Sequence, residues 1–164
     1  MTRSLRCMNS APSPKGARKR ILLVDDDRSV RESLSLVLLG EGYLVLTAGN
    51  GDDALKLAGE SPLDLVILDL NMPVKNGWDT FEQFSREHPL LPVVIATARS
   101  NQLFTAMGAG VAALLEKPLD IPELLLTVNR LLTQPQESHL ARLAGKESDM
   151  LYSPAAGKEP TGVE

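Results

Sequence analysis

Short apolar runs alternate with longer stretches of helical period between residues 20 and 132. The apolar positions in each run are consecutive, which is typical of strands that helices cover on both faces. The alternation therefore predicts an α/β fold with a parallel sheet between two helical layers. The predicted strands are Arg20 to Asp25, Tyr43 to Ala48, Asp64 to Asp69, Pro92 to Thr97 and Ala112 to Lys117.

A helix is predicted after each of the five strands. In the first, the apolar residues that repeat at helical spacing, up to the glycines Gly40 and Gly42, are Val30, Leu34, Val37 and Leu38. Residues suited to helix capping start the second helix at Asn50 and the fifth at Asp120. The third helix follows Gly77, and the fourth is short, spanning roughly residues 101 to 109.

Composition narrows the function classes. The chain has 164 residues, one cysteine and two histidines, which argues against a disulfide framework, a cysteine zinc site and a serine-histidine-aspartate hydrolase. No apolar stretch is long enough for a membrane span. The net charge is -4, but residues 1–20 hold six basic residues and no acid, which leaves -10 for the rest. An acidic body argues against nucleic acid as the main ligand.

The two ends of the chain lack the apolar periodicity of the body. Residues 1–19 are predicted to be a disordered basic arm, residues 20–133 a single folded domain, and residues 134–164 a mostly disordered tail that contains at most a short helix. The alternatives for the arm are a targeting presequence, a membrane-surface contact or a start of translation at Met8. The alternative for the tail is an ordered docking segment.

Polar residues stand where the predicted strands end. They are Asp25, Asp26, Asp27, Asp69, Thr97 and Lys117. Because the carboxyl ends of parallel strands meet at one edge of a sheet, these residues are expected to lie together. A helix cap explains Asp27 well, but a cap needs only one of three acids. Asp69 precedes a sharp loop rather than a helix, so capping does not explain it.

Three carboxylates at one edge repel one another, since a like-charged pair ~4 Å apart costs on the order of 4 kcal/mol at an effective dielectric of 20. A hard divalent cation that prefers oxygen ligands would balance them, and Mg²⁺ fits this need. Lys117 supplies a second positive charge suited to a phosphoryl oxygen, and Thr97 a hydroxyl donor. Together these groups suggest phosphoryl transfer onto an aspartate.

The segment from Arg20 to Leu132 resembles the receiver domain of two-component response regulators. The resemblance rests on Ile-Leu-Leu-Val-Asp-Asp-Asp ending at Asp27, on Leu68-Asp69-Leu-Asn-Met-Pro73 followed by Gly77, on Ala96-Thr97-Ala98, and on Glu116-Lys117-Pro118. It implies a flavodoxin-like, doubly wound fold of five βα units with strand order 2-1-3-4-5. It also implies a cytoplasmic signalling switch that catalyses its own phosphoryl acceptance and hydrolysis.

The resemblance assigns roles to individual residues. Asp69 would be the phosphoacceptor, while Thr97 and Lys117 would contact the phosphoryl group, with Lys117-Pro118 as a cis peptide. The Mg²⁺ ligands would be Asp25, Asp26, Asp69 and the backbone carbonyl of Asn71. The phosphate would come from a sensor histidine kinase or a histidine phosphotransfer protein. Because residues 133–164 are too few for an output domain, we expect the signal to pass to an unknown downstream protein by contact or by onward phosphotransfer. No nucleic acid or membrane partner is expected.

Two departures from the family pattern concern signal output. Many receivers carry an aromatic residue three positions before the lysine, whereas this chain has Leu114. Any switch is therefore expected to work by repacking of Leu103, Phe104 and Leu114.

The fifth predicted helix also carries Leu125 and Leu126 beyond its main apolar stripe. These residues belong either to a wide buried face or to a homodimer contact through helices four and five.

Two other functions fit part of the sequence. Asp25-Asp26-Asp27 after an apolar strand approximates the opening motif of haloacid-dehalogenase-like phosphohydrolases, in which Asp25 would be the nucleophile. Such enzymes need a further acid pair beyond the lysine, and here only Asp120 follows nearby. The chain could also be a receiver-like scaffold that binds partners without being phosphorylated. A phosphate donor would label Asp69 in the receiver interpretation and Asp25 in the phosphohydrolase interpretation, so the labelled residue separates these two.

Overall fold

The computed structural model describes residues 18–72, 77–99, 101–134, 137, 140–141, 144 and 150–157. This set leaves out residues 1–17 of the predicted arm and the Pro73 end of the quoted motif. It also leaves out most of residues 134–149 and all of residues 158–164 of the predicted tail, and the side chain of Phe104.

Six strands and five helices form the described part of the chain, in the order that the sequence predicts up to the fifth helix. The strands are β1 (Arg20–Val24), β2 (Leu44–Ala48), β3 (Leu65–Asp69), β4 (Val93–Thr97), β5 (Ala113–Glu116) and β6 (Leu151–Ser153). The helices are α1 (Arg28–Gly40), α2 (Gly51–Glu60), α3 (Gly77–Glu87), α4 (Leu103–Ala109) and α5 (Ile121–Thr133).

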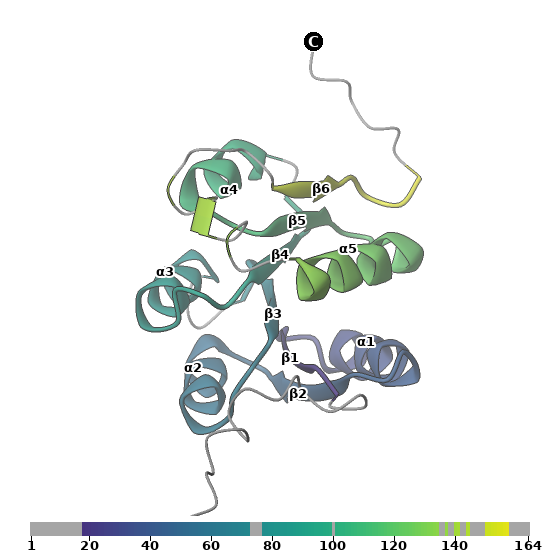
Figure 1. Ribbon diagram of the computed structural model, residues 1–164. Coiled ribbons are helices and arrows are strands. Elements are labelled where there is room, and N and C mark those ends of the chain that lie inside the picture. The colour runs from purple at the N-terminus through teal and green to yellow at the C-terminus, as the bar shows by residue number, and fades with distance from the viewer. Residues whose placement is uncertain are drawn as a thin grey trace, which may run out of the picture.

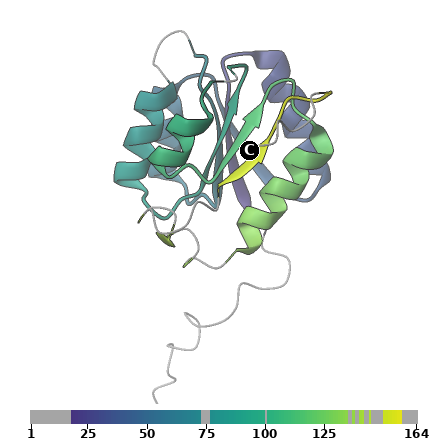
Figure 2. The same cartoon turned by 90° about the horizontal axis from the view of Figure 1, so that it is seen from above.

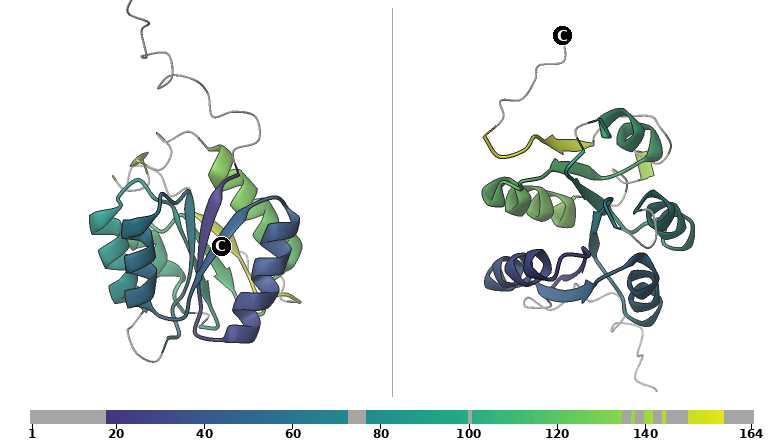
Figure 3. Two further views of the ribbon diagram at one scale, coloured as in Figure 1. Left: turned by 90° about the horizontal axis from the view of Figure 1, so that it is seen from below. Right: turned by 180° about the vertical axis from the view of Figure 1, so that it is seen from behind.

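The six strands form one parallel sheet in the order β2-β1-β3-β4-β5-β6. Helices α1 and α5 cover one face of the sheet, and α2, α3 and α4 cover the other (Figure 1). The view from above and the two further views show the same three layers (Figures 2 and 3). The α/β flavodoxin-like arrangement and the order of the first five strands are thus confirmed.

The sixth strand corrects the predicted count of five. Leu151–Ser153 lies in the segment that was predicted to be mostly disordered, yet it pairs in parallel with Ala113–Leu115 of β5. Three residues are too few to show an alternating pattern in sequence. The strand also depends on the edge of β5 for its backbone partners, which a local pattern does not reveal.

Two apolar clusters fill the space between the sheet and its helices. Leu22, Leu68 and Phe84 belong to the cluster under α2, α3 and α4, whereas Ile67 and Leu124 belong to the cluster under α1 and α5. Alternate residues of the central strands therefore point into opposite layers, and all five residues of β3 and of β4 are buried. Burial on both faces explains the consecutive apolar runs.

The helix ends follow the capping residues seen in the sequence. Asn50 Oδ1 accepts a hydrogen bond from Asp53 N at 2.8 Å, and Asp120 Oδ1 accepts one from Glu123 N at 3.2 Å. The short helix α4 ends at Gly110, whose φ of 79° is a left-handed conformation that glycine adopts without strain. Within the described ranges, no helix has both the length and the apolarity to cross a membrane.

Candidate functional site

Four strand ends place polar side chains at one rim of the sheet. Asp25 follows β1, Asp69 and Thr97 end β3 and β4, and Lys117 follows β5. The side chains of Asp25, Asp69 and Thr97 are buried. Asp25, Asp26 and Asp69 each present a carboxylate oxygen, and these oxygens lie within 4.8 Å of one another. The structure therefore brings together the acids that the sequence separates by more than forty positions.

Lys117 balances part of this negative charge. Its Nζ donates to Asp25 Oδ2 at 2.7 Å and lies 3.5 Å from Asp69 Oδ2. Its backbone N donates to Thr97 O at 2.8 Å, which ties the lysine to the end of β4. The Lys117-Pro118 peptide is cis, as the resemblance implied. The amine thus reaches across the sheet to the ends of β1 and β3.

Asp25 is held by its own loop and by α1. Asp25 Oδ1 accepts from Asp27 N at 2.9 Å, and the Asp25 carbonyl accepts from Arg31 Nη1 at 2.6 Å. Sequence reasoning missed Arg31, because one arginine on a helix gives no signal that separates it from a solvated charge. Asp27 caps α1 by accepting from Ser29 N at 2.9 Å and Val30 N at 3.3 Å, which confirms the capping interpretation for this acid.

Asp69 is held by the loop that follows it and by the start of α3. Asn71 N donates to Asp69 Oδ1 at 2.9 Å. A Cβ at Gly77 would lie 2.5 Å from Leu70 Cα and 2.8 Å from Asp69 O, so only glycine allows α3 to pack this closely. The sequence showed Gly77 as a helix start but did not show this contact. The Asn71 carbonyl stays a predicted ligand.

Burial and charge act on the ionisation of both central groups. Burial raises the pKa of Asp69, and the charges of Asp25 and Asp26 raise it further, although the Asn71 N–H and Lys117 oppose this rise. For Lys117, burial acts to lower the pKa, but the hydrogen bond and charge of Asp25, together with Asp69, raise it overall. The lysine is therefore held as a cation beside a carboxylate whose negative charge is costly.

The acid cluster fits the coordination chemistry of Mg²⁺. Three carboxylates offer the hard oxygen donors that this ion prefers, and Asp26 is exposed, which leaves room for retained water. A divalent cation would also relieve the repulsion that raises the pKa of Asp69. The Thr97 hydroxyl oxygen accepts from Arg99 N at 3.0 Å, so its own hydrogen is available to donate.

Leu114, the residue at the expected aromatic position, is almost fully buried in the cluster under α2, α3 and α4. Leu103 of α4 packs against the same cluster, as does Tyr152 of β6. On α5, Leu125 packs partly into the opposite layer, whereas Leu126 is exposed. The repacking of Leu103 and Leu114 and the homodimer both stay predictions.

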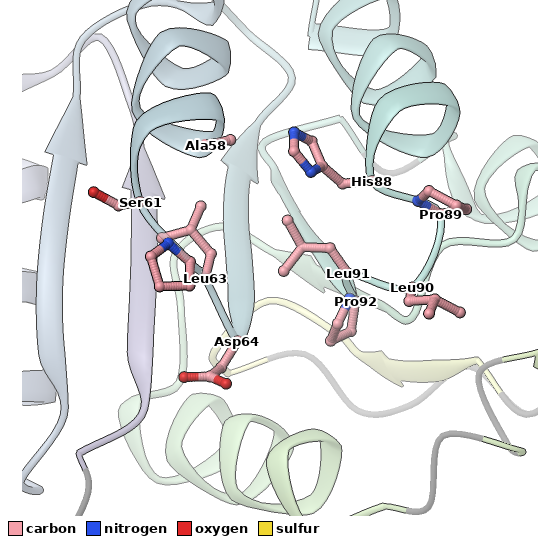
Figure 4. Close-up of a pocket in the computed structure, with 10 residues that line it drawn as sticks. Ala58, Ser61, Leu63, Asp64, His88, Pro89, Leu90, Leu91 and Pro92 are labelled. Atoms are coloured by element: carbon pink, nitrogen blue, oxygen red, sulfur yellow. The ribbon is translucent and has the colours of Figure 1, made fainter. Parts of the chain in front are cut away.

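A hollow of about 540 Å³ lies at the opposite end of the strands (Figure 4). The loops after α2 and α3 line it with Asp64, His88 and several proline and leucine side chains. None of the residues that the sequence singled out as the site lines this hollow.

Comparison with known proteins identifies the family. Residues 21–129 match the family described as the response regulator receiver domain. The chain is 36% identical over 143 residues to the transcriptional regulatory protein CpxR of Klebsiella pneumoniae, covering 86% of this chain and 61% of CpxR. It is 33% identical over 136 residues to the DNA-binding transcriptional regulator NtrC of Salmonella typhimurium, covering 80% of this chain and 29% of NtrC. The chain thus spans less than two thirds of the length of these relatives.

Solved structures share the fold. The response regulator protein TrrA of Thermotoga maritima, in complex with Mg²⁺ and BeF, aligns with a TM-score of 0.65 and 34% identity, over 69% of this chain and 98% of TrrA. A CheY-like receiver domain protein of Methanospirillum hungatei aligns with a TM-score of 0.70 and 27% identity, over 74% of this chain and 98% of that protein. With the family match across most of its folded body, this chain belongs to the response regulator receiver domain family.

Proposed function

We propose that this chain accepts a phosphoryl group on Asp69 from a phosphohistidine of a partner protein, either a sensor histidine kinase or a histidine phosphotransfer protein. The observation that carries the proposal is the position of Asp69 between two further acids and Lys117. Its Oδ1 accepts from Asn71 N at 2.9 Å, whereas the polar contact of Oδ2 among the described residues is the longer one, 3.5 Å, to Lys117. Asp69 Oδ2 is thus the oxygen best placed to act as nucleophile.

In the proposed transfer, Asp69 Oδ2 forms a bond to phosphorus as the P–N bond to the partner's histidine breaks. The imidazole nitrogen keeps the electron pair of that bond, and because the other ring nitrogen carries a proton, the ring leaves as neutral imidazole. Mg²⁺ would be held by Asp25, Asp26, Asp69 and the Asn71 carbonyl. When bound, it supplies positive charge against the phosphoryl oxygens.

Lys117 and Thr97 contact the transferred group in this proposal. The Lys117 ammonium already faces Asp69 Oδ2, so a phosphoryl oxygen on that atom would meet a positive charge. The Thr97 hydroxyl ends the neighbouring strand and would donate to a second oxygen. Later attack by water on phosphorus would return the free carboxylate and inorganic phosphate.

The phosphohydrolase interpretation has less support in the geometry. It requires Asp25 as the nucleophile, yet Asp25 Oδ2 accepts from Lys117 at 2.7 Å and Oδ1 accepts from Asp27 N at 2.9 Å. Whichever of the two oxygens attacked phosphorus, a short hydrogen bond would already engage it and reduce its nucleophilicity. The scaffold interpretation has to account for a complete set of acids, threonine and lysine that performs no reaction.

Mapping of the labelled residue tests the proposal. The full chain is treated with acetyl phosphate and Mg²⁺, and the phosphorylated peptide is identified by mass spectrometry. We expect the label on Asp69, and no label in Asp69→Asn or without Mg²⁺. Label on Asp25 would establish the phosphohydrolase chemistry instead, and an unlabelled wild-type chain would favour the scaffold.

Output in this proposal uses protein contacts on the domain surface, including the exposed Met107 and Leu126 of α4 and α5. Dimerisation through these helices is tested by analytical ultracentrifugation with and without beryllofluoride, and a monomer in both states excludes it.

The relatives give no support to the predicted absence of nucleic-acid binding, because the NtrC relative is named as a DNA-binding regulator.

A further inference from the structure

The segment 150–157 holds the residues on both sides of Lys117. The Tyr152 hydroxyl donates to Glu116 Oε1 at 2.8 Å, and Ala156 N donates to the Pro118 carbonyl at 2.9 Å. Lys117 lies between these two attachment points. The backbone that carries the Lys117 side chain is therefore fixed from the outer edge of the sheet, while its amine reaches inward to Asp25 and Asp69.

This segment is seated along most of β5, with Leu151–Ser153 paired to Ala113–Leu115. Leu151 N donates to Ala112 O at 3.1 Å at the start of the strand, and the register pairs Leu114 with Tyr152. Its side chains alternate between the two layers: Met150 and Tyr152 pack on the cluster under α4, and Leu151 on the cluster under α5. Ser153 and Ala155 are buried as well. Figure 1 shows β6 lying beside β5 as the last strand of the sheet.

Glu116 links the segment to the site. It is a buried carboxylate that pairs in register with Thr97 on one side, and on the other side it accepts the Tyr152 hydroxyl. A buried carboxylate that loses a hydrogen-bond donor changes its conformation or draws in water. Either change acts directly on the next residue, Lys117. Burial raises the pKa of Tyr152, and the hydrogen bond to Glu116 raises it further.

We propose that residues 150–157 act as a positioning element for Lys117, and that Tyr152 is its central positioning residue. This proposal rests on the proposed phosphorylation of Asp69. When a phosphoryl group arrives, the Lys117 ammonium has to exchange its 2.7 Å contact with Asp25 for phosphoryl oxygens. A backbone held at Glu116 and at Pro118 restricts the lysine to the conformations that reach those oxygens, which reduces the entropy lost on binding.

The test uses Tyr152→Phe in the full chain, with Tyr43→Phe as the matched control. Tyr43 is the other tyrosine of the chain and packs in the opposite layer, far from β5 in the order of strands. Binding of beryllofluoride in the presence of Mg²⁺ is measured by calorimetry. We expect Tyr152→Phe to weaken binding by about threefold to tenfold, the usual effect of one lost hydrogen bond, and Tyr43→Phe to leave it unchanged.

The route of the effect is tested in a Lys117→Gln background. If Tyr152 acts through Lys117, Tyr152→Phe has no further effect there, since the group it positions is gone. An equal loss in both backgrounds would show a merely structural role and overturn the proposal. Hydrogen exchange of residues 113–118 gives a second readout, and we expect faster exchange in Tyr152→Phe alone.

The two proposals fail in different ways. If the wild-type chain binds no beryllofluoride and is not labelled on Asp69, the proposed function is wrong. If the wild-type chain binds it and Tyr152→Phe binds equally well, the phosphoryl site stands and the positioning role of residues 150–157 is rejected. Urea unfolding of each variant shows that the compared proteins are folded.

Discussion

The two ends of the sheet differ in how their charges are held. At the carboxyl end, Lys117 and Asp25 form a short contact between side chains that are 22% and 4% exposed. At the amino end, Lys19 lies 3.9 Å from Asp64, and these side chains are 49% and 38% exposed. Water screens the second pair, so it contributes little free energy, whereas burial makes the charges of the first pair strongly interdependent.

The amino end nevertheless has the hollow shown in Figure 4. Its walls are mainly proline and leucine side chains of two loops, and His88 makes a tilted ring contact with Phe84. Space alone therefore does not indicate a reactive site in this protein. The end proposed to be reactive is the one where strand ends bring buried, mutually dependent charges together.

The largest expected effect separates the two lysines. Lys117→Gln should lower the rate of phosphorylation by acetyl phosphate about 100-fold, because the amine that faces the phosphoryl oxygens is removed. Lys19→Gln should leave the rate unchanged. Stopped-flow measurement of both variants checks this difference, and similar rates for the two would remove the distinction between the ends.

A smaller loss is expected at the end of β4. Thr97→Val keeps the shape of the buried side chain but removes its hydroxyl, so the phosphorylation rate should fall about tenfold. Thr97→Ser restores the hydroxyl and should recover most of the rate. If Thr97→Ser is as slow as Thr97→Val, packing rather than hydrogen bonding explains the loss.

The acids should differ in their effect on stability. Because the pKa of Asp69 is raised, the folded protein binds this proton more tightly than the unfolded chain. The group therefore favours folding below its ordinary pKa of 3.8, and that contribution is lost as the pH rises through the raised pKa. Without metal at pH 7, Asp69→Asn should increase the free energy of unfolding by on the order of 1 kcal/mol.

Urea unfolding at two pH values checks the sign of this effect. The gain should shrink as the pH falls through the raised pKa of Asp69 toward 3.8, because the folded wild-type carboxyl group takes up its proton over that range. Asp64→Asn at the amino end should instead lower stability slightly, since Asp64 Oδ2 accepts from Arg20 N at 2.7 Å and a neutral amide oxygen is a weaker acceptor than a carboxylate. A gain for Asp69→Asn that does not depend on pH would contradict the electrostatic cause.

The smallest expected effect is in the hollow. His88→Ala removes the ring contact with Phe84 and should lower the unfolding midpoint slightly, while the phosphorylation rate stays within about twofold of wild type. A large change in rate would mean that the two ends of the sheet communicate.

The sequence predicted the first five strands and the grouping of the acids for a physical reason. Strands buried on both faces need consecutive apolar residues, and parallel strands bring their carboxyl ends to one edge, so Asp25, Asp69 and Lys117 could be grouped without coordinates. The family resemblance then separated Asp69 from Asp25, which residue types alone left open.

Features that depend on contacts between distant segments could not be predicted. The support of Asp25 by Arg31 and the packing of Gly77 on Asp69 depend on how helices dock, which periodicity does not specify. Strand β6 is the clearest case, because its three residues are followed by Pro154 and gain order only beside β5. Local propensity is weak evidence for a strand whose partners come from one neighbour.

One consequence of β6 concerns self-association. An edge strand presents unpaired N–H and C=O groups that another molecule can extend, and short edge strands limit this tendency. In the described part of the sheet, β6 takes up the outer side of β5, and β2 is the other outermost strand. A chain shortened before Met150 would expose the longer β5 ladder, and concentrated samples of it should form lateral aggregates sooner than the chain with residues 150–157.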